Sequence, residues 1–388
     1  MSEIKVNSIK GVGASAAAIT VNNTDGTATA NLTNRQNRNL IINGAMQVSQ
    51  RSVSSTTSGY GSIDRFSATY GGTDEAITHS QINVAPTEAG AGTAGFRNAF
   101  RIQNGNQTSG FGTTDYIQYQ QIIEDQNIAN SGWIVNDPNS FITVSYWIRS
   151  SVAQQFFGFV ETSDGADWMY GWTTGVLTAN VWTKITKTIP GRSNLSWSND
   201  NGHGLLVAPV TLWGTDRTDP SVGNDVWHAY SGSARTPDAT STWWTTNDAT
   251  IDITGVQVEV GSVATDFEHR SFGQELALCQ RYYQQYVNPC ITGATPDNGS
   301  KAYSLGLQFQ TRMRAVPTLT IANAGNGGNV FDGSSNQSIS SLNAADRNVD
   351  GASIYLNLAG DLNNFRPACT GLNDSTTHTT TYKFTAEL

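Results

Sequence analysis

Apolar and polar side chains alternate along much of this 388-residue chain. In residues 141–149 (FITVSYWIR) the apolar side chains Ile142, Val144, Tyr146 and Ile148 occupy every second position. A period of two places successive side chains on opposite faces of a β-strand. Similar runs predict further strands over residues 40–42, 63–69, 116–123, 156–161, 182–189, 205–212, 250–260, 303–310, 318–322, 353–358 and 379–386.

The run at residues 250–260 changes phase in its middle. Ile251 and Ile253 share one parity, whereas Val256 and Val258 have the other, and Gly255 lies at the change. A glycine at such a point is typical of a β-bulge or a bent strand. We therefore expect one long strand with a bulge at Gly255.

Only residues 274–286 have a clear helical period. Leu276, Cys279 and Tyr283 recur at helical spacing, and Ser271 with Gln274 has the spacing of a capping box. This pattern predicts one connecting helix between two β regions.

These patterns divide the chain into four parts. We expect an N-terminal segment (1–38), a large β-sandwich or jelly-roll domain (39–270), the connecting helix (271–286) and a smaller C-terminal β-sandwich (287–388). The predicted fold class is therefore all-β. No repeat of 20 to 50 residues is visible, which weighs against a parallel β-helix.

The N-terminal segment has too few large apolar residues to form its own core. Residues 22–26 (NNTDG) predict a turn between two short strands rich in Ala and Thr. A segment this short usually needs help from other chains to be ordered. It is expected to bind copies of itself or a larger assembly, with an unstructured tail as the alternative.

Composition and charge exclude several classes of partner. Charged residues make up 14% of the chain and the net charge is −9, so neither nucleic acid nor an anionic membrane surface is an expected partner. No apolar run is long enough to span a bilayer, and the N-terminus lacks a signal peptide, so synthesis in a cytoplasm is expected. The three cysteines, Cys279, Cys290 and Cys369, have no metal-ligand spacing and form no disulfide framework.

Several stretches together resemble bacteriophage tail-fibre proteins of the marine phage type, which carry a jelly-roll module similar to carbohydrate-binding modules. The opening residues 3–9 are similar to short virion-anchoring N-termini of such proteins. These stretches are residues 3–9 (EIKVNSI), 40–51 (LIINGAMQVSQR), 64–66 (DRF), 255–261 (GVQVEVG), 264–270 (ATDFEHR), 275–283 (ELALCQRYY) and 311–318 (TRMRAVPT).

The resemblance covers most of the chain, but its motifs mark scaffold and not a ligand site. It implies a homotrimeric virion fibre that touches the host surface, with the short segment of residues 1–38 as its anchor to other virion proteins, and it does not identify the receptor.

An alternating aromatic stripe is the first candidate glycan site. Trp168, Tyr170 and Trp172 lie on one face of an extended segment, beside Asp164 and Asp167. Aromatic rings stack on the apolar faces of sugars, and carboxylates accept hydrogen bonds from sugar hydroxyls. The alternative is that these rings pack inside the sandwich.

The second candidate is the polar stretch from Trp213 to Trp244, which reads as a long loop. Loops of this length in a compact domain are uncommon and often functional. The alternative is a loop packed against a neighbouring subunit. The candidate residues in this stretch are Asp216, Arg217, Trp227, His228, Tyr230, Trp243 and Trp244.

Signs of enzymatic chemistry or of a cofactor are weak. Residues 90–95 (GAGTAG) match a dinucleotide fingerprint but lack the strand and helix around it, so a loop is expected. Asp164 with Asp167, or Glu161 with Asp164, would have to form the carboxylate pair of a glycosidase. Residues 164–167 could bind calcium but are no EF-hand. We therefore expect no catalytic residues, no metal and no cofactor.

The sequence thus predicts a non-enzymatic, trimeric virion tail fibre that binds bacterial glycans. The first alternative is a head or neck fibre, or another decoration protein, without receptor binding. The second is a glycan depolymerase.

Overall fold

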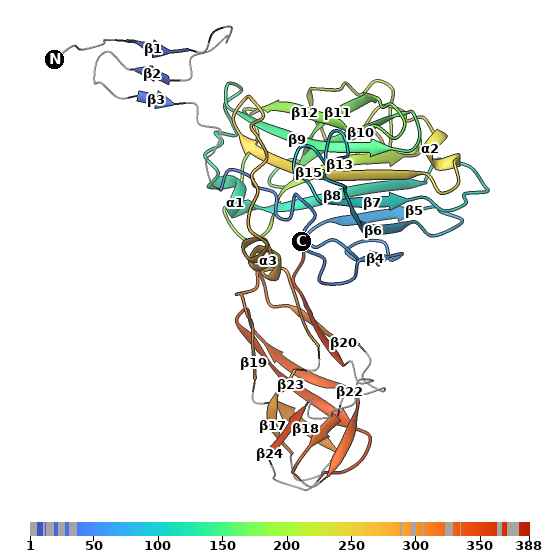
Figure 1. Ribbon diagram of the computed structural model, residues 1–388, viewed down its shortest axis with the longest axis vertical. Helices are drawn as coiled ribbons and strands as arrows, with labels where there is room; N and C mark the ends of the chain where they lie inside the picture. The colour runs from blue at the N-terminus through green and yellow to red at the C-terminus, as the bar shows by residue number, and fades with distance from the viewer. Residues whose placement is uncertain are drawn as a thin grey trace, which may run out of the picture.

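The computed structural model describes residues 6–10, 12, 19–21, 28–30, 37–287, 289–295, 300–304, 306–322, 329–333, 335–362, 367–370 and 380–388. Within these ranges the chain is nearly all β, with three short helices. Figure 1 shows a small N-terminal sheet standing apart, a broad β-sandwich, and a narrower C-terminal β region, with helix α3 between the last two. The expected all-β class with a β-sandwich is confirmed. None of the helices in the described ranges is long and apolar enough to cross a bilayer.

The sandwich consists of two six-stranded antiparallel sheets, named here after a central strand of each. The β13 sheet has the order β14 (Trp227–Ala229), β11 (Trp168–Val176), β10 (Gln155–Thr162), β13 (His203–Trp213), β8 (Tyr116–Glu124) and β5 (Ser67–Gly71). The β9 sheet has the order β12 (Thr183–Pro190), β9 (Phe141–Ser150), β15 (Thr250–Val260), β7 (Asn98–Gln103), β6 (Thr78–Asn83) and β4 (Ser54–Ser55).

A single large core fills the space between these sheets. The alternating residues Ile142, Val144, Tyr146 and Ile148 of β9 are all fully buried in it, as their pattern predicted. The Tyr146 hydroxyl accepts a hydrogen bond from Trp172 Nε1 (3.0 Å) and donates one to the Pro209 carbonyl (2.8 Å). The polar ends of these large rings are therefore satisfied inside the core.

Strand β15 has the predicted bulge. Its pairing with β9 shifts between Thr254 and Gln257, and Gly255 has a φ of +64°. A Cβ at Gly255 would lie 2.5 Å from the Phe96 ring, so both the backbone conformation and the close approach require glycine here. The bulge lets Ile253 and Val256 both point into the core.

Two of the strand predictions for the sandwich fail, one completely and one in part. Residues 40–42 form no strand, because side chains hold this backbone: Asn39 accepts a hydrogen bond from Ile41 N, and Gln121 bonds both backbone groups of Ile42. The strand predicted over residues 63–69 begins only at Ser67, because Arg65 has a φ of +69° and interrupts the extended backbone.

The connecting helix is shorter than predicted, and it is not alone. Helix α3 (Phe272–Gln280) begins at the predicted capping box of Ser271 and Gln274 but ends before Tyr283, which starts strand β16 (Tyr283–Val287). The backbone of β16 pairs with β25 instead of continuing the helix. Two further short helices, α1 (Asp125–Ala129) and α2 (Thr242–Thr245), were not predicted.

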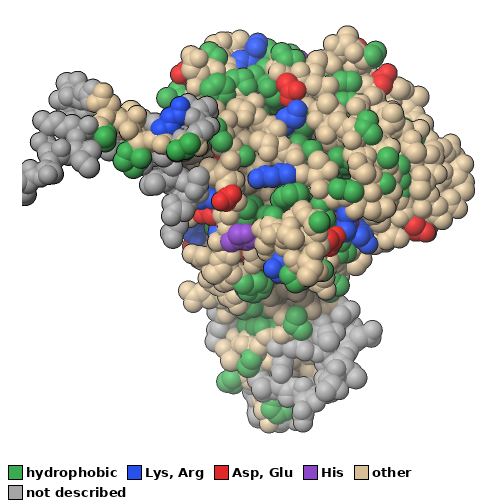
Figure 2. Space-filling model, turned by 45° about the horizontal axis from the view of Figure 1, so that its top comes forward, with side chains coloured by type: hydrophobic (Ala, Val, Ile, Leu, Met, Phe, Trp, Pro, Cys, Tyr) green, Lys and Arg blue, Asp and Glu red, His purple; other side chains and the backbone are tan. Residues whose placement is uncertain are grey.

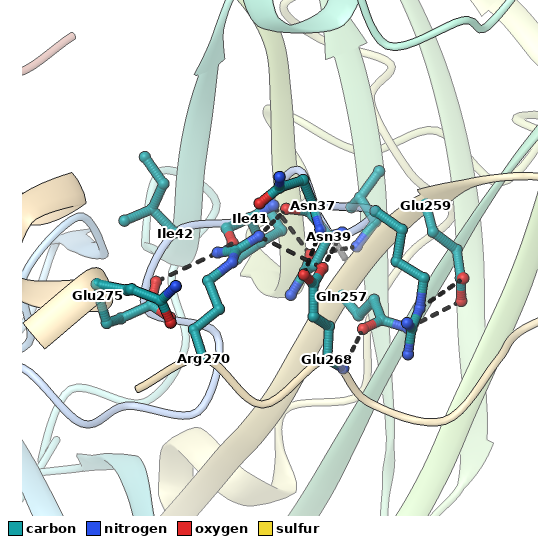
Figure 3. Close-up of polar contacts among 12 residues, drawn as sticks. Asn37, Asn39, Ile41, Ile42, Gln257, Glu259, Glu268, Arg270 and Glu275 are labelled. Atoms are coloured by element: carbon teal, nitrogen blue, oxygen red, sulfur yellow. Dashed lines mark hydrogen bonds and ion pairs between the residues drawn. The ribbon is translucent and has the colours of Figure 1, made fainter. Parts of the chain in front are cut away.

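A polar network fixes the chain where it enters the sandwich (Figure 3). Glu268 accepts a hydrogen bond from Asn39 N (2.7 Å), and its own backbone N–H donates to Gln257 (2.8 Å). Arg270 donates to the carbonyls of Asn39 and Ile41. Residues of the motif stretches 40–51, 255–261 and 264–270 thus bond to one another's backbone groups. These motifs therefore serve the fold and not a ligand site.

A second polar network joins the sandwich to the C-terminal region. Arg281 binds the buried Glu124 through two hydrogen bonds of 2.8 Å each, and the Tyr282 hydroxyl donates to the same carboxylate. Arg65, 1% exposed, lies 3.4 Å above the Tyr282 ring and pairs with Glu387. A joint with this many buried partners holds the two regions in one orientation.

The chain end and two more motif stretches close this joint. Arg51 lies 3.8 Å over the Tyr283 ring and pairs with Glu387, and Arg314 donates to the carbonyls of Ala386 and Glu387. The C-terminus accordingly lies beside α3 in Figure 1. Most of the motifs that carry the tail-fibre resemblance therefore meet at this joint.

The C-terminal region has its own core, which includes Ile354, Leu356, Tyr382 and Phe384. The strand predicted over residues 303–310 is interrupted near Gly306, whose φ is +126°. One sheet consists of β16, β25 (Thr381–Thr385) and β20 (Thr318–Ala322). The other has the order β18 (Lys301–Ser304), β17 (Thr292–Ala294), β24 (Pro367–Thr370), β21 (Asn329–Phe331), β22 (Asn336–Arg347), β23 (Gly351–Leu358) and β19 (Leu307–Gln308).

The N-terminal sheet consists of β1 (Ser8–Ile9), β2 (Ile19–Val21) and β3 (Ala28–Ala30). It stands away from the sandwich in Figure 1, and none of its residues with a described side chain is buried. The predicted antiparallel pair of short strands is present as β2 and β3, whereas the turn at residues 22–26 lies outside the described residues.

Candidate functional site

The structure places most of the predicted aromatic residues in the core. Trp172, Trp243 and Trp244 are fully buried, and Trp244 Nε1 donates to the Gly110 carbonyl. Tyr170 and Trp227 are also buried and pack edge to face at 5.4 Å. These five rings stabilise the sandwich and are not available to stack on a sugar, which corrects their assignment as candidate contacts.

The stretch from Trp213 to Trp244 is also more regular than predicted. It contains β14 and α2, which dock their tryptophans into the core. Trp227 lies in β14, and Trp243 and Trp244 lie in α2. The polar composition of the stretch gave no sign of these short elements.

Trp168 lies at an edge of the sandwich, half-buried. The Arg192 guanidinium carbon is 3.6 Å from the centre of its ring. The ring packs toward the main core, whereas the next residue, Met169, points to the opposite face of the β13 sheet.

Three predicted residues do come together, on the face of the β13 sheet that points away from the main core. His228 lies on this face in β14, and Arg217 and Tyr230 reach it from the connections around β14. We call this surface the outer aromatic face. It comprises Tyr116, Gln118, Gln120, Glu161, Trp213, Arg217, His228, Tyr230 and Arg235.

Stacked aromatic and guanidinium groups organise the outer aromatic face. Tyr116 and Trp213 are direct partners across β8 and β13. The Arg217 guanidinium lies 4.8 Å from the Tyr116 ring centre, and the Arg235 guanidinium lies 5.0 Å from Trp213 and 5.2 Å from Tyr230. Arg235 also donates a hydrogen bond of 2.7 Å to the Tyr230 hydroxyl. Such contacts fix the orientation of both rings and guanidinium groups.

Below these rings lies a small apolar cluster. Phe159, Met169, Ala208 and Trp213 are nearly fully buried, although they point away from the main core. Phe159 and Trp213 contact each other with ring centres 5.2 Å apart. This cluster supports Tyr230 and Tyr116, which remain half-buried at the surface.

Glu161 is the acidic group of the outer aromatic face. Burial raises the pKa of its carboxyl to about 7, Asp167 adds to this effect and Arg235 opposes it. No described residue forms a hydrogen bond or ion pair with Glu161. The carboxyl is therefore free to accept or donate a hydrogen bond near neutral pH.

The sequence analysis did not name Arg235 or Tyr116 as site residues, named Trp213 only as the start of a stretch, and considered Glu161 only as a member of a carboxylate pair. Tyr116 belongs to a predicted strand, and Trp213 directly follows the strand predicted over residues 205–212; continued alternation assigns both to the face opposite Leu212 and Ile117. This alternation was the sequence signal that could have identified Trp213 and Tyr116 as outward-facing residues. The approach of Arg235 depends on the course of the connection around β14, which has no pattern of its own.

Asp216, another candidate, is exposed beside Arg217. Asp164 lies elsewhere, at the end of the sandwich, where it accepts a hydrogen bond from Ser198 N. Burial, together with Asp164 and Asp200, raises the pKa of the neighbouring Asp125 to about 7. No group of three potential ligands in the described ranges has the arrangement of a metal site.

The glycine-rich residues 90–95 form a loop, as predicted. This loop lies on the outer surface of the β9 sheet, where a Cβ at Gly90 would be 2.5 Å from Trp182 Cβ. The glycines thus serve close packing of backbone on Trp182 and Trp147, whose rings share a cluster with Ala91. Of the cysteines, Cys279 is buried and Cys290 exposed, and both are free thiols.

On the face seen in Figure 2, Lys and Arg side chains are scattered among polar, hydrophobic and acidic side chains and form no continuous patch. That face therefore offers no continuous basic surface to a nucleic acid.

No family model matches this sequence, and no curated protein matches it. Its structural neighbours include carbohydrate-binding modules and a phage tailspike domain. The enzymatically active domain of bacteriophage CBA120 tailspike protein 4 is 10% identical with a TM-score of 0.31, covering 57% of this chain and 21% of that chain.

Two sugar-binding proteins are similarly distant. A putative sugar-binding protein from Bacteroides thetaiotaomicron is 11% identical with a TM-score of 0.30, covering 58% of this chain and all of the other. TmCBM61, solved with β-1,4-galactotriose, is 8% identical with a TM-score of 0.27, covering 58% of this chain and 99% of that chain.

Proposed function

We propose that this protein is a virion tail fibre that binds a glycan on a bacterial surface through the outer aromatic face. The virion role rests on the sequence motifs, and the glycan role rests on the chemistry of this face. Both are proposals beyond the fold itself.

The glycan role rests on one observation: aromatic rings and polar side chains that have no ion-pair partner in the described part of the chain lie together on one surface of a sheet. Tyr116 and Tyr230 offer half-buried rings, and Arg217, Arg235 and Glu161 lie among them. Gln118 and Gln120, which bond to each other, extend the polar row along β8. A pyranose needs this combination, because one of its faces is apolar and its rim carries hydroxyl donors and acceptors.

A trimeric assembly anchored through residues 1–38 is part of the proposal. The small N-terminal sheet has no buried side chain among its described residues, so those residues give no sign of packing against the sandwich. Three short strands need an apolar face packed on something to be stable. Copies of the same chain, or another virion protein, would supply that surface.

We propose a binding protein without catalytic activity. Asp164 is engaged at the end of the sandwich with Ser198 and beside Asp125, whereas Glu161 lies on the outer aromatic face. A structural fibre without receptor binding is the second candidate, favoured by the buried ionic joint that stiffens the molecule.

Two binding experiments test the proposal. The protein is first applied to a glycan array, and its binding to polysaccharides purified from bacterial surfaces is then measured. Tyr230→Ala removes one ring of the outer aromatic face and is expected to weaken binding at least tenfold, which corresponds to about 1.4 kcal/mol. Trp168→Ala is the matched control, because it removes a half-buried ring that also stacks with an arginine, but at the sandwich edge.

The result separates the candidates. Loss of binding in Tyr230→Ala with retention in Trp168→Ala supports the outer aromatic face. The opposite pattern would place the site at the edge, and no binding by the unaltered protein would leave the structural fibre. Release of new reducing ends from a bound polysaccharide would contradict the non-enzymatic role.

A further inference from the structure

Two arginines of the outer aromatic face have no carboxylate partner. Within the described ranges, the Arg217 side chain forms no hydrogen bond or ion pair, and that of Arg235 bonds only the Tyr230 hydroxyl. The Nε of each is buried without a partner. Elsewhere in the sandwich and the joint, carboxylates pair with most arginines: Arg51, Arg65, Arg101, Arg149, Arg270 and Arg281.

The two guanidinium groups without a carboxylate partner contact neighbouring rings. They stack on Tyr116 and Trp213, which face each other directly across β8 and β13. The connections that carry them are also tied together, since Arg235 N donates to the Arg217 carbonyl (3.0 Å). In a chain with a net charge of −9, this is a local pair of unneutralised cations.

The acidic side chains nearby do not cancel this charge. Asp216 is exposed to solvent, where its field is screened. The pKa of Glu161, raised by burial to about 7, keeps much of that carboxyl protonated near neutral pH. Asp167, in the β10–β11 connection, faces Glu161 and is also exposed to solvent. His228 lies two strands from Glu161 on the same face, since Met169 pairs with both residues.

We propose that the ligand of the outer aromatic face is an acidic saccharide, whose carboxylate binds between Arg217 and Arg235. The inference rests on the proposed glycan-binding function and specifies its ligand class. A guanidinium presents a planar fork of N–H donors that matches a carboxylate, and stacking on the rings fixes that fork in advance. The sugar ring attached to the carboxylate then lies against Tyr116 or Tyr230.

Matched pairs of oligosaccharides test this ligand class. Each pair contains a uronic acid oligosaccharide and the same compound with its carboxyls reduced to alcohols, presented together on an array. The unaltered protein is expected to bind the acidic member at least tenfold more tightly, because a charge-assisted pair of hydrogen bonds is lost in the reduced one. Its affinity for the acidic member should fall as salt is raised.

Arginine variants locate the effect. Arg217→Gln and Arg235→Gln are each expected to lose about tenfold in affinity for the acidic member and little for the reduced one. Arg192→Gln is the matched control, since Arg192 also stacks on a tryptophan without an ion pair but lies at the sandwich edge. Melting curves of all variants establish that they are folded.

The outcomes distinguish this inference from the function on which it rests. Equal binding of both members of each pair, or unchanged binding by Arg217→Gln and Arg235→Gln, would overturn the acidic ligand and leave glycan binding intact. If the unaltered protein binds no saccharide on the array and none of the purified surface polysaccharides, both the proposed function and the acidic ligand are overturned.

Discussion

At the scale of single residues, burial decides which tryptophans serve the core and which lie near a possible ligand. Trp243 is fully buried, and the Asn104 amide donates hydrogen bonds to the backbone carbonyls of Trp243 and Trp244. Trp243→Ala is expected to lower the free energy of unfolding by about 3–5 kcal/mol, because it leaves a large cavity. Chemical denaturation measures this, with half-exposed Trp168→Ala as the comparison. A Trp243→Ala protein that unfolds at the same denaturant concentration would contradict the buried position.

Glu161 gives a pH dependence of a definite sign. Its pKa is raised in the folded protein to about 7, so between its ordinary value near 4.5 and pH 7 the folded state binds more protons than the unfolded state. The contribution of Glu161 to stability therefore falls as pH rises through this window.

The Glu161→Gln variant should lack this fall. Its melting temperature is expected to exceed that of the unaltered protein more at pH 8 than at pH 4. Subtracting the two profiles removes the contribution of Asp125, whose pKa is also raised to about 7. A difference that does not change with pH would contradict the burial of Glu161.

At the scale of elements, alternation predicted those strands whose two faces differ. Strands β9 and β15 follow their predictions closely, because their inward positions are apolar throughout and Gly255 marks the bulge. Strand β14 escaped prediction because three residues are too few to show a period. Helix α3 was predicted too long because Tyr283 continues its spacing, although pairing with β25 decides the conformation of Tyr283.

The site residues were less predictable than the strands, because contacts between residues far apart in the sequence bring them together. Tyr230 and Arg217 could be singled out as an aromatic and a cation in a polar stretch. Their neighbours Trp213 and Arg235 are brought to them by cross-strand pairing and by the backbone bond between Arg235 and Arg217, which involve long-range register.

The joint between the sandwich and the C-terminal region is also an element-scale prediction. Arg281→Ala leaves the buried Glu124 without its bidentate partner, and is expected to lower stability by about 3 kcal/mol. Arg312→Ala, which removes the exposed ion pair with Asp350, should change stability by less than about 0.5 kcal/mol. Thermal unfolding and small-angle scattering of both variants measure stability and orientation. A rigid, fully stable Arg281→Ala protein would show that the joint is held by other contacts.

At the scale of the whole molecule, the N-terminal sheet has no buried side chain among its described residues, and we propose that other chains stabilise it. We expect light scattering on the full chain to give three times the mass of one chain, and removal of residues 1–36 to reduce that mass. The sandwich of the shortened protein should melt unchanged, because its core lies entirely beyond residue 38. A monomeric full chain, or a dimer, would reject the trimer.

The central claim is that the outer aromatic face is the glycan site. A crystal structure of the full chain with the tightest saccharide from the array tests it most directly. The account predicts a sugar ring against Tyr116 or Tyr230, with its polar groups bonded to Arg217, Arg235 and Glu161. A saccharide bound at the Trp168 edge, or on the C-terminal region, with the outer aromatic face empty, would contradict it.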